Sequence, residues 1–181
     1  LGALARAEST VSKETTPGVY AQYTYKLGEK FTVMPGVRWD HSSRYGGFFT
    51  PRLHVKYSPN SIVTLRTSVG KGYRSPHALA ENVSLLASGR EIFVSPDLKQ
   101  EEAWNTGASL GFNIPLFGRN LELNAEYYYT DFVNQMIMNF DGASGQHTLR
   151  FENLDGKSYS HTFQVDATYA LFSGMTATAA F

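Results

Sequence analysis

Residues 19–27 read VYAQYTYKL and residues 31–40 read FTVMPGVRWD, with only Gly28, Glu29 and Lys30 between them. In both runs the odd positions are apolar or aromatic, and the even positions are mainly polar or small. Side chains of a β-strand point alternately to its two faces, so this period of two predicts strands with one apolar face. The short turn between them predicts an antiparallel hairpin.

The same alternation recurs along the rest of the chain, which predicts about eight antiparallel strands in all. The further runs cover residues 52–57, 63–69, 104–112, 121–132, 163–171 and 175–181. Tight turns near Gly28, Pro59, Gly118 and Ser173 alternate with longer links near His41, at 74–100 and at 141–147. This rhythm is typical of an up-and-down transmembrane β-barrel, so the expected fold class is all-β.

Strand length and side-chain distribution bear on whether the apolar face meets lipid. Strands of roughly 10 residues match a tilted membrane crossing, whereas globular strands average about 5–6 residues. A soluble barrel or sandwich would show the same alternation with its apolar face turned inward. The polar face is hydrophilic on nearly every strand, and Trp39 and Tyr127–Tyr129 lie near strand ends, where an interfacial aromatic belt is expected. Both features favour the membrane barrel.

Composition narrows the possible functions. The 181 residues suit one domain, and charged residues make up only 18%, below the roughly 25% of soluble domains. Sixteen basic and sixteen acidic side chains cancel, which argues against nucleic-acid binding. The absence of cysteine excludes disulfides and thiolate metal sites. The sequence contains no run of about 18 apolar residues, so no transmembrane helix is predicted. The first residues lack signal-peptide features, so we expect the chain to begin within a longer protein.

Two short boxes lie in and beside the longest link. The first is Tyr73-Arg74-Ser75-Pro76, and the second is Ser95-Pro96-Asp97-Leu98-Lys99-Gln100-Glu101. They resemble the aromatic-Arg-small-Pro and Asn-Pro-Asp/Asn-Leu boxes of TonB-dependent outer-membrane receptors, with Ser95 where the family more often has Asn. Residues 18–23, 35–40 and 50–52 also resemble hairpin strands of these barrels. The resemblance spans nearly the whole chain.

The resemblance implies a domain organisation and a function. Residues 17–181 would be one segment of a larger barrel, residues 1–16 the tail of an outer loop, and the plug domain would be absent from this chain. The segment would lie in the bacterial outer membrane, in contact with its lipids. It would supply the wall and outer loops for energised uptake of a scarce large solute, such as a ferric siderophore, haem or cobalamin, with TonB acting through the plug. No cofactor is implied.

Several residues of the expected outer loops could hold an anionic iron chelate or a flat macrocycle through charge-assisted hydrogen bonds and stacking. The candidates are Arg44, Tyr45, Tyr73, Arg74, His77 and Arg90. His77 follows the first box, and imidazole is a good axial ligand of haem iron. For Arg74, an alternative role is to fix the loop to the barrel wall.

Other functional classes are weaker. The five histidines show no metal-binding spacing, so no metal site is expected. A hydrolase could use His54, Asp166 and a serine, but polar side chains occur on every predicted strand without catalysis, so we expect no enzyme. A small eight-stranded outer-membrane barrel with a structural or adhesive role is the remaining alternative.

Overall fold

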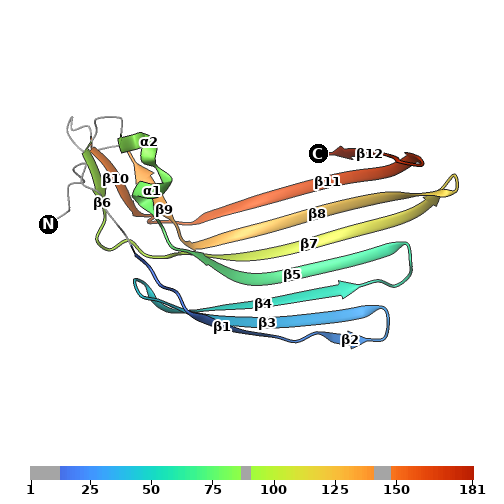
Figure 1. Cartoon of the computed structure of the whole chain (residues 1–181), viewed down its shortest axis with the longest axis horizontal. Coiled ribbons are helices and arrows are strands. Elements are labelled where there is room, and N and C mark those ends of the chain that lie inside the picture. The colour runs from blue at the N-terminus through green and yellow to red at the C-terminus, as the bar shows by residue number, and fades with distance from the viewer. Residues whose placement is uncertain (1–12, 87–90, 141–147) are drawn as a thin grey trace.

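A computed structural model describes residues 13–86, 91–140 and 148–181. Its main element is a long antiparallel sheet, in the order β1-β3-β4-β5-β7-β8-β11-β12 (Figure 1). The strands are β1 (Gly18–Gln22), β2 (Tyr25–Leu27), β3 (Phe31–Ser42), β4 (Gly46–Tyr57), β5 (Val63–Arg74), β7 (Glu101–Leu116), β8 (Arg119–Asn134), β11 (Ser158–Phe172) and β12 (Met175–Ala180). Strand β2 follows β1 along the edge of β3. The predicted all-β, up-and-down arrangement is confirmed.

The tight turns gather at one end of the sheet (Figure 1). They join β2 to β3, β4 to β5, β7 to β8 and β11 to β12, as the sequence predicted. In the β7–β8 turn, Phe117 and Gly118 both have positive φ, 51° and 75°. Two such residues give a turn whose twist matches that of the flanking strands, and glycine adopts this conformation without steric cost.

The link near His41 is short, so the prediction of a longer loop there was wrong. Strands β3 and β4 stay paired as far as Ser42 and Gly46, which leaves only residues 43–45 as the turn. The Ser42 hydroxyl accepts hydrogen bonds from the backbone N–H groups of Arg44 and Tyr45, each at 3.1 Å. The link was expected to begin near His41, where the apolar pattern ends, but backbone pairing continues past that point.

Prolines set where the ladders break. The N–H of Tyr23 donates to the Pro35 carbonyl at 3.0 Å, but Pro35 has no N–H to return the bond, and here β1 and β2 separate. The β4–β5 ladder likewise ends at Arg52 and Gly70, next to Pro51. The last residues of β5, 71–74, are therefore not paired with β4 and diverge from it, at the end opposite the tight turns.

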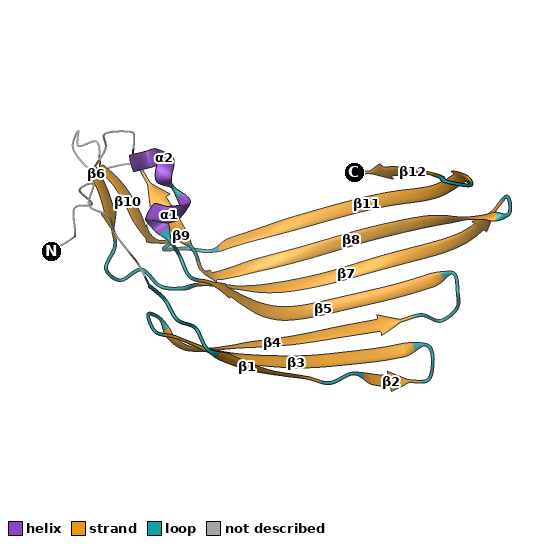
Figure 2. Ribbon diagram, viewed as in Figure 1, coloured by secondary structure: helices purple, strands orange, loops and turns teal. Residues whose placement is uncertain are grey.

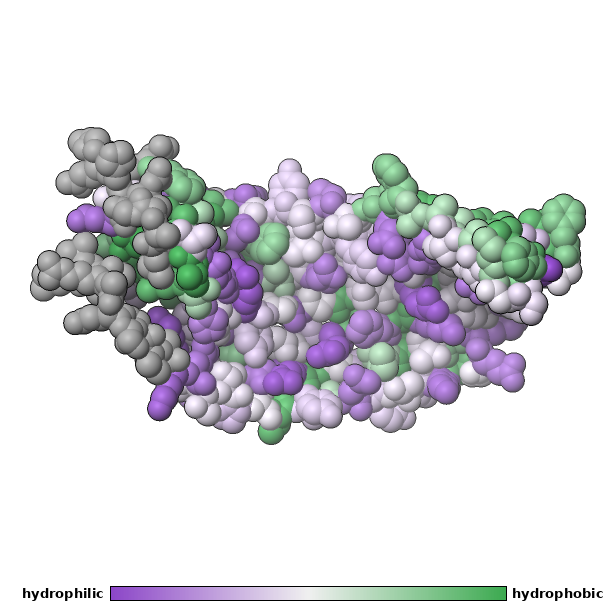
Figure 3. Space-filling model, turned by 45° about the horizontal axis from the view of Figure 1, so that its top comes forward, coloured by the Kyte–Doolittle hydropathy of each residue, from purple (hydrophilic) through white to green (hydrophobic). Residues whose placement is uncertain are grey.

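The sheet has two chemically different faces. Figure 3 shows hydrophilic side chains spread over one of them. The register places Tyr128 on this polar face, opposite Gly107, where its hydroxyl donates to Glu126 at 3.2 Å. A Cβ atom at position 107 would lie 2.5 Å from the Tyr128 ring, so this glycine makes room for it. The assignment of Tyr128 to an aromatic belt was wrong, because alternation separates it from its two neighbours.

A small second sheet stands at the end opposite the tight turns (Figure 2). It consists of β6 (Glu91–Val94), β10 (Thr148–Asn153) and β9 (Met136–Asn139), with the short helices α1 (Ala78–Glu81) and α2 (Val83–Leu86) beside it. We call these five elements the outer unit. Strand β6 comes from the link between β5 and β7, whereas β9 and β10 come from the link between β8 and β11. The two long connections therefore fold together.

The outer unit contains the buried apolar side chains found among the described residues. They are Ala78, Ile92, Leu149 and Phe151, with Leu149 and Phe151 exposed by only 0% and 1%. Parallel pairing of β6 with β10 sets Ile92 beside Leu149. In the main sheet, by contrast, the apolar side chains are half-buried or exposed. This is expected of a sheet whose apolar face contacts an apolar environment outside the protein.

Within the part of the chain that the structure describes, no helix is long and apolar enough to cross a membrane.

Replacing Phe151 by alanine should loosen the outer unit and leave the main sheet folded. Truncating a buried phenylalanine costs about 3–5 kcal/mol, and this core is too small to absorb the loss. Limited proteolysis of the natural full-length protein should show faster cleavage within residues 75–100 and 135–157, the two connections that contain the outer unit. Phe117→Ala is the matched control, because Phe117 is 90% exposed in a tight turn. Equal cleavage of both variants would show that the outer unit does not depend on this core.

Candidate functional site

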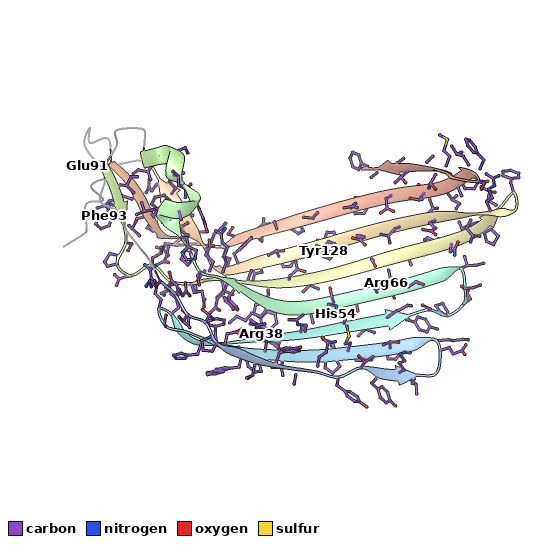
Figure 4. All side chains as sticks on the ribbon, viewed as in Figure 1. Arg38, His54, Arg66, Glu91, Phe93 and Tyr128 are labelled. Atoms are coloured by element: carbon purple, nitrogen blue, oxygen red, sulfur yellow. The ribbon has the colours of Figure 1, made fainter. Side chains whose placement is uncertain are left out.

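A line of basic side chains crosses the polar face of three neighbouring strands. Figure 4 shows Arg38 on β3, His54 on β4 and Arg66 on β5, each successively closer to the tight turns. We call the full set the basic stripe: Arg38, Arg52, His54, Lys56 and Arg66. Register accounts for it, since Lys56 pairs with Arg66, and Arg52 pairs with Gly36 and Gly70.

The basic stripe has few counter-charges of its own. Arg52, Lys56 and Arg66 form no ion pair with any other described residue. Asp40 pairs with Arg38, whereas the carboxylates of Glu126 and Asp166 lie further across the polar face, on β8 and β11, where Asn124 donates to both. Positive charge therefore gathers over β3–β5 and negative charge over β8–β11.

A pocket of about 230 Å³ lies at the outer part of the basic stripe. Arg38 and Arg52 line it together with Tyr20 and Gln22 of β1, and Gly36 forms its floor. The Arg52 side chain lies over this glycine, so closely that a Cβ atom at position 36 would be 3.0 Å from Arg52 Cγ. Two guanidinium groups, a phenol and an amide make this a donor-rich pocket suited to an anion.

Asp40 fixes the orientation of Arg38. Its carboxylate is fully buried and accepts from Arg38 Nε at 2.7 and 2.9 Å, and from the Tyr73 hydroxyl at 3.3 Å. The carboxylate lies against Gly18, where any Cβ atom would collide with it. Because Asp40 engages Nε, the two terminal nitrogens of Arg38 remain able to face the pocket. Tyr73 reaches Asp40 because the end of β5 diverges from β4. The centroid of its ring lies 3.7 Å from that of the Phe48 ring.

Glu14 joins three segments at the rim of the main sheet. Its carboxylate accepts from the hydroxyls of Ser42 at 2.6 Å and Ser75 at 2.9 Å. Gln100 in turn donates to the Ser75 hydroxyl at 3.4 Å. Hydrogen bonding from Ser42 is the largest influence on the Glu14 pKa and lowers it from 4.5; burial opposes this, and Ser75, His77 and Thr16 add to the lowering.

The two sequence boxes contact each other. Arg74 Nε lies 2.5 Å from Glu101 Oε2, and its terminal nitrogen lies 3.5 Å from Glu81 of α1. Glu101 also accepts from the backbone N–H of Met136 at 3.0 Å, at the start of β9. Arg74 thus holds the outer unit to the sheet, which is the structural role weighed for it from sequence.

The outer unit has a second attachment through Asn153. Its side-chain oxygen accepts from the N–H of Lys99 at 2.9 Å, and its side-chain nitrogen donates to the Asp97 carbonyl at 2.8 Å. The second box is therefore bound to the β10–β11 connection as well as to the first box.

The remaining predicted loop residues are spread over the outer end. Arg44 and Tyr45 occupy the β3–β4 turn, where the guanidinium lies 5.6 Å from the ring centroid. Burial raises the pKa of the Tyr45 phenol. His77 is exposed just before α1, and its imidazole makes no hydrogen bond to another described residue. Arg90 lies outside the described residues. Among the described members of the predicted set, Tyr73 is connected to Arg38 of the basic pocket, because both bind Asp40.

Sequence reasoning missed the basic stripe as a site. The alternation placed Arg38 on the polar side of one predicted strand and Arg52, His54 and Lys56 on the polar side of the next. Their alignment with one another, and with Arg66, depends on the register between strands. The signal was present in the alternation, since Arg52, His54 and Lys56 share one face of a single strand. The described residues contain no group of three metal-binding side chains.

The family model for the TonB dependent receptor-like beta-barrel matches residues 2–181. The chain belongs to this family. Its sheet is therefore a stretch of outer-membrane barrel wall, with the polar face inside the barrel and the apolar face toward lipid. The basic stripe and its pocket consequently line the interior of the receptor barrel, below the outer unit.

Individual relatives agree with this assignment. The chain is 27% identical over 114 residues to the iron-regulated outer membrane virulence protein of Vibrio cholerae, covering 62% of the chain and 17% of the relative. It is 26% identical over 115 residues to the ferrienterobactin receptor of Escherichia coli K12, covering 58% and 15%. A crystal structure of the ferric enterobactin receptor PfeA superposes with a TM-score of 0.71 at 19% identity, covering 94% of the chain and 27% of that structure. The chain thus spans about a sixth of the length of these curated relatives.

The Glu14 contact should weaken in acid. A carboxyl group whose pKa is lowered in the folded state stabilises that state fully above its unfolded pKa, and loses this contribution as the pH falls through the folded pKa. The rim contact should therefore persist at and above pH 4.5 and fade below it. A spin label at Ser43→Cys, titrated in the full-length receptor, should become mobile only in that acid range.

Glu14→Gln provides the comparison for this titration, since its amide cannot ionise. In this variant the label should be more mobile at neutral pH and should show little further change in acid. Glu29→Gln, in a tight turn at the other end of the sheet, should behave like the unsubstituted protein. An acid transition that survives in Glu14→Gln would assign the pH dependence to another group.

Proposed function

We propose that this chain forms wall and outer loops of a receptor that takes up an anionic ferric siderophore across the bacterial outer membrane. The pocket between Arg38 and Arg52 carries the proposal. Catecholate and carboxylate iron chelates bear negative charge and many oxygen acceptors. Guanidinium groups bind such oxygens in pairs and remain charged at every physiological pH.

The basic stripe extends this pocket along the inner wall. A ligand that leaves Arg38 and Arg52 meets His54, and then Lys56 and Arg66 closer to the tight turns. Because most of these cations have no paired carboxylate nearby, their field favours an anion along the whole line. This separation of charge suits the passage of an anion better than the passage of a neutral solute.

The relatives' names support the substrate class. Two of the matched curated proteins are ferric enterobactin receptors, and a third name refers to iron regulation. Uptake would require energy from TonB, which in this family acts through a plug domain. We further propose that residues 1–16 belong to an outer loop, since Thr15 and Pro17 accept backbone hydrogen bonds from Ser43 and His41 at the outer end.

The alternative of a small closed barrel has less support. A closed eight-stranded barrel would pair its first and last strands, whereas β1 and β12 are opposite ends of an open path. Haem remains a ligand to test beside siderophores, because His77 is exposed at the outer end. Cobalamin completes the set of probes.

Arg38→Gln and Arg52→Gln should each weaken binding of ferric enterobactin to the full-length receptor by about tenfold or more. A charge-assisted hydrogen bond contributes about 1.5–3 kcal/mol, and glutamine keeps a polar side chain while removing the charge. Tryptophan quenching by ferric enterobactin, haem and cyanocobalamin measures the affinities.

Arg119→Gln is the matched control, because it removes the same charge at the tight-turn end, where Arg119 donates to the Ala170 carbonyl. Its affinity should equal that of the unsubstituted receptor. Unchanged siderophore affinity in both pocket variants would remove the proposed site. Haem binding that is lost in His77→Ala would assign the receptor to haem instead.

A further inference from the structure

The lipid-facing surface of the barrel wall contains an apolar groove. It has a volume of about 400 Å³ and runs across β4, β5, β7 and β8. Two rows of paired residues form it, one from Leu53 to Tyr129 and the next from Val55 to Tyr127. The middle strands contribute the small side chains of Thr67, Thr106 and Ala108. Larger side chains on β4 and β8 rise on either side of this small-residue floor.

A cluster of hydrogen-bonding aromatic residues borders the groove on β8 and β11. The Tyr127 hydroxyl lies 2.7 Å from His161 Nδ1, and the other imidazole nitrogen has no hydrogen-bond partner among the described residues. The ring centroids of Tyr129 and Tyr159 lie 5.1 and 5.4 Å from the centroid of the His161 ring. Tyr127, Tyr159 and His161 are exposed on the lipid-facing side. We call these four residues the Tyr–His cluster.

Polarity falls across the groove, from the row of residues on its outer side to the row on its tight-turn side. The row just outside it contains Lys71, which pairs with Glu102 at 2.5 Å, and continues through Trp104 and Asp131 to Tyr159. The row on the tight-turn side contains Leu65, Leu110, Ala125 and Val165. Charged groups are costly within hydrocarbon and tolerated near the headgroups, so the outer row marks the headgroup level. The groove lies directly beside this row, on its hydrocarbon side.

We propose that this groove binds one acyl chain of a phosphorylated outer-leaflet lipid, whose headgroup oxygens accept hydrogen bonds from the Tyr–His cluster. The surface around the groove already contacts the bilayer, so a lipid reaches it without any further docking step. A protein partner would need a larger surface, since stable protein interfaces bury about 1,200–2,000 Å². The small floor side chains make a recess that a flexible hydrocarbon chain can fill.

The test uses the full-length receptor purified in mild detergent and mixed with diphosphorylated lipid A, with bound lipid counted by native mass spectrometry. Ala108→Phe fills the floor of the groove and should abolish the retained lipid. Ala167→Phe makes the same change on the same face, on β11 outside the groove, and should retain lipid as the unsubstituted receptor does. Heat-modifiable electrophoretic migration verifies that each barrel is folded, and Thr106→Leu replaces Ala108→Phe if that variant does not fold.

A separate variant tests the contact between the lipid headgroup and the Tyr–His cluster. His161→Phe keeps a ring but removes the imidazole nitrogens, and it should reduce retention of phosphorylated lipid A more than retention of the dephosphorylated form. Equal retention in Ala108→Phe and Ala167→Phe would overturn the groove as a lipid site, and an equal effect on both lipids would overturn the headgroup contact. A receptor dimer that Ala108→Phe dissociates would assign the groove to a second copy of the protein instead.

Discussion

Backbone hydrogen bonding in a medium without water is the constraint on which this structure depends. An N–H or C=O group left unpaired in hydrocarbon costs several kcal/mol, so the chain crosses the membrane as strands whose partners lie alongside. Pairing then fixes the faces, because residues opposite each other point the same way. The basic stripe, the lipid-facing groove and the Tyr128–Gly107 contact all follow from this single register. Where proline interrupts a ladder, as at Pro51, the end of β5 turns away and Tyr73 reaches Asp40.

Beyond the membrane-spanning part, a different interaction takes over. The outer unit has an apolar core of its own, centred on Leu149 and Phe151, and needs only a few polar attachments to the sheet. Those attachments converge on the two sequence boxes, through Arg74 with Glu101 and through Asn153 with the second box. The boxes therefore serve to join the two long connections to the wall. This leaves the inner face of the sheet to supply the donors that meet a ligand.

Much of the fold was predictable from sequence, because alternation is a local signal that each strand carries alone. The strands, the tight turns and the family followed from it and from the boxes at Tyr73–Pro76 and Ser95–Glu101. The β3–β4 turn did not, since its length is set by backbone pairing beyond the apolar pattern. Nor did the basic stripe, because register joins residues that are far apart in sequence. The Glu14 contact was equally hidden, as it links residues 28 and 61 positions apart.

Solvent accessibility along β4 tests the central claim that alternate residues of this sheet face lipid and the barrel interior. Single spin-labelled cysteines at Arg52, Leu53, His54 and Val55 in the full-length receptor, in lipid bilayers, would report collision with oxygen, which concentrates in hydrocarbon, and with a water-soluble nickel chelate. We predict high oxygen accessibility at Leu53 and Val55 and low oxygen accessibility at Arg52 and His54. Oxygen accessibility that is uniform along the strand, or highest at Arg52 and His54, would contradict the account.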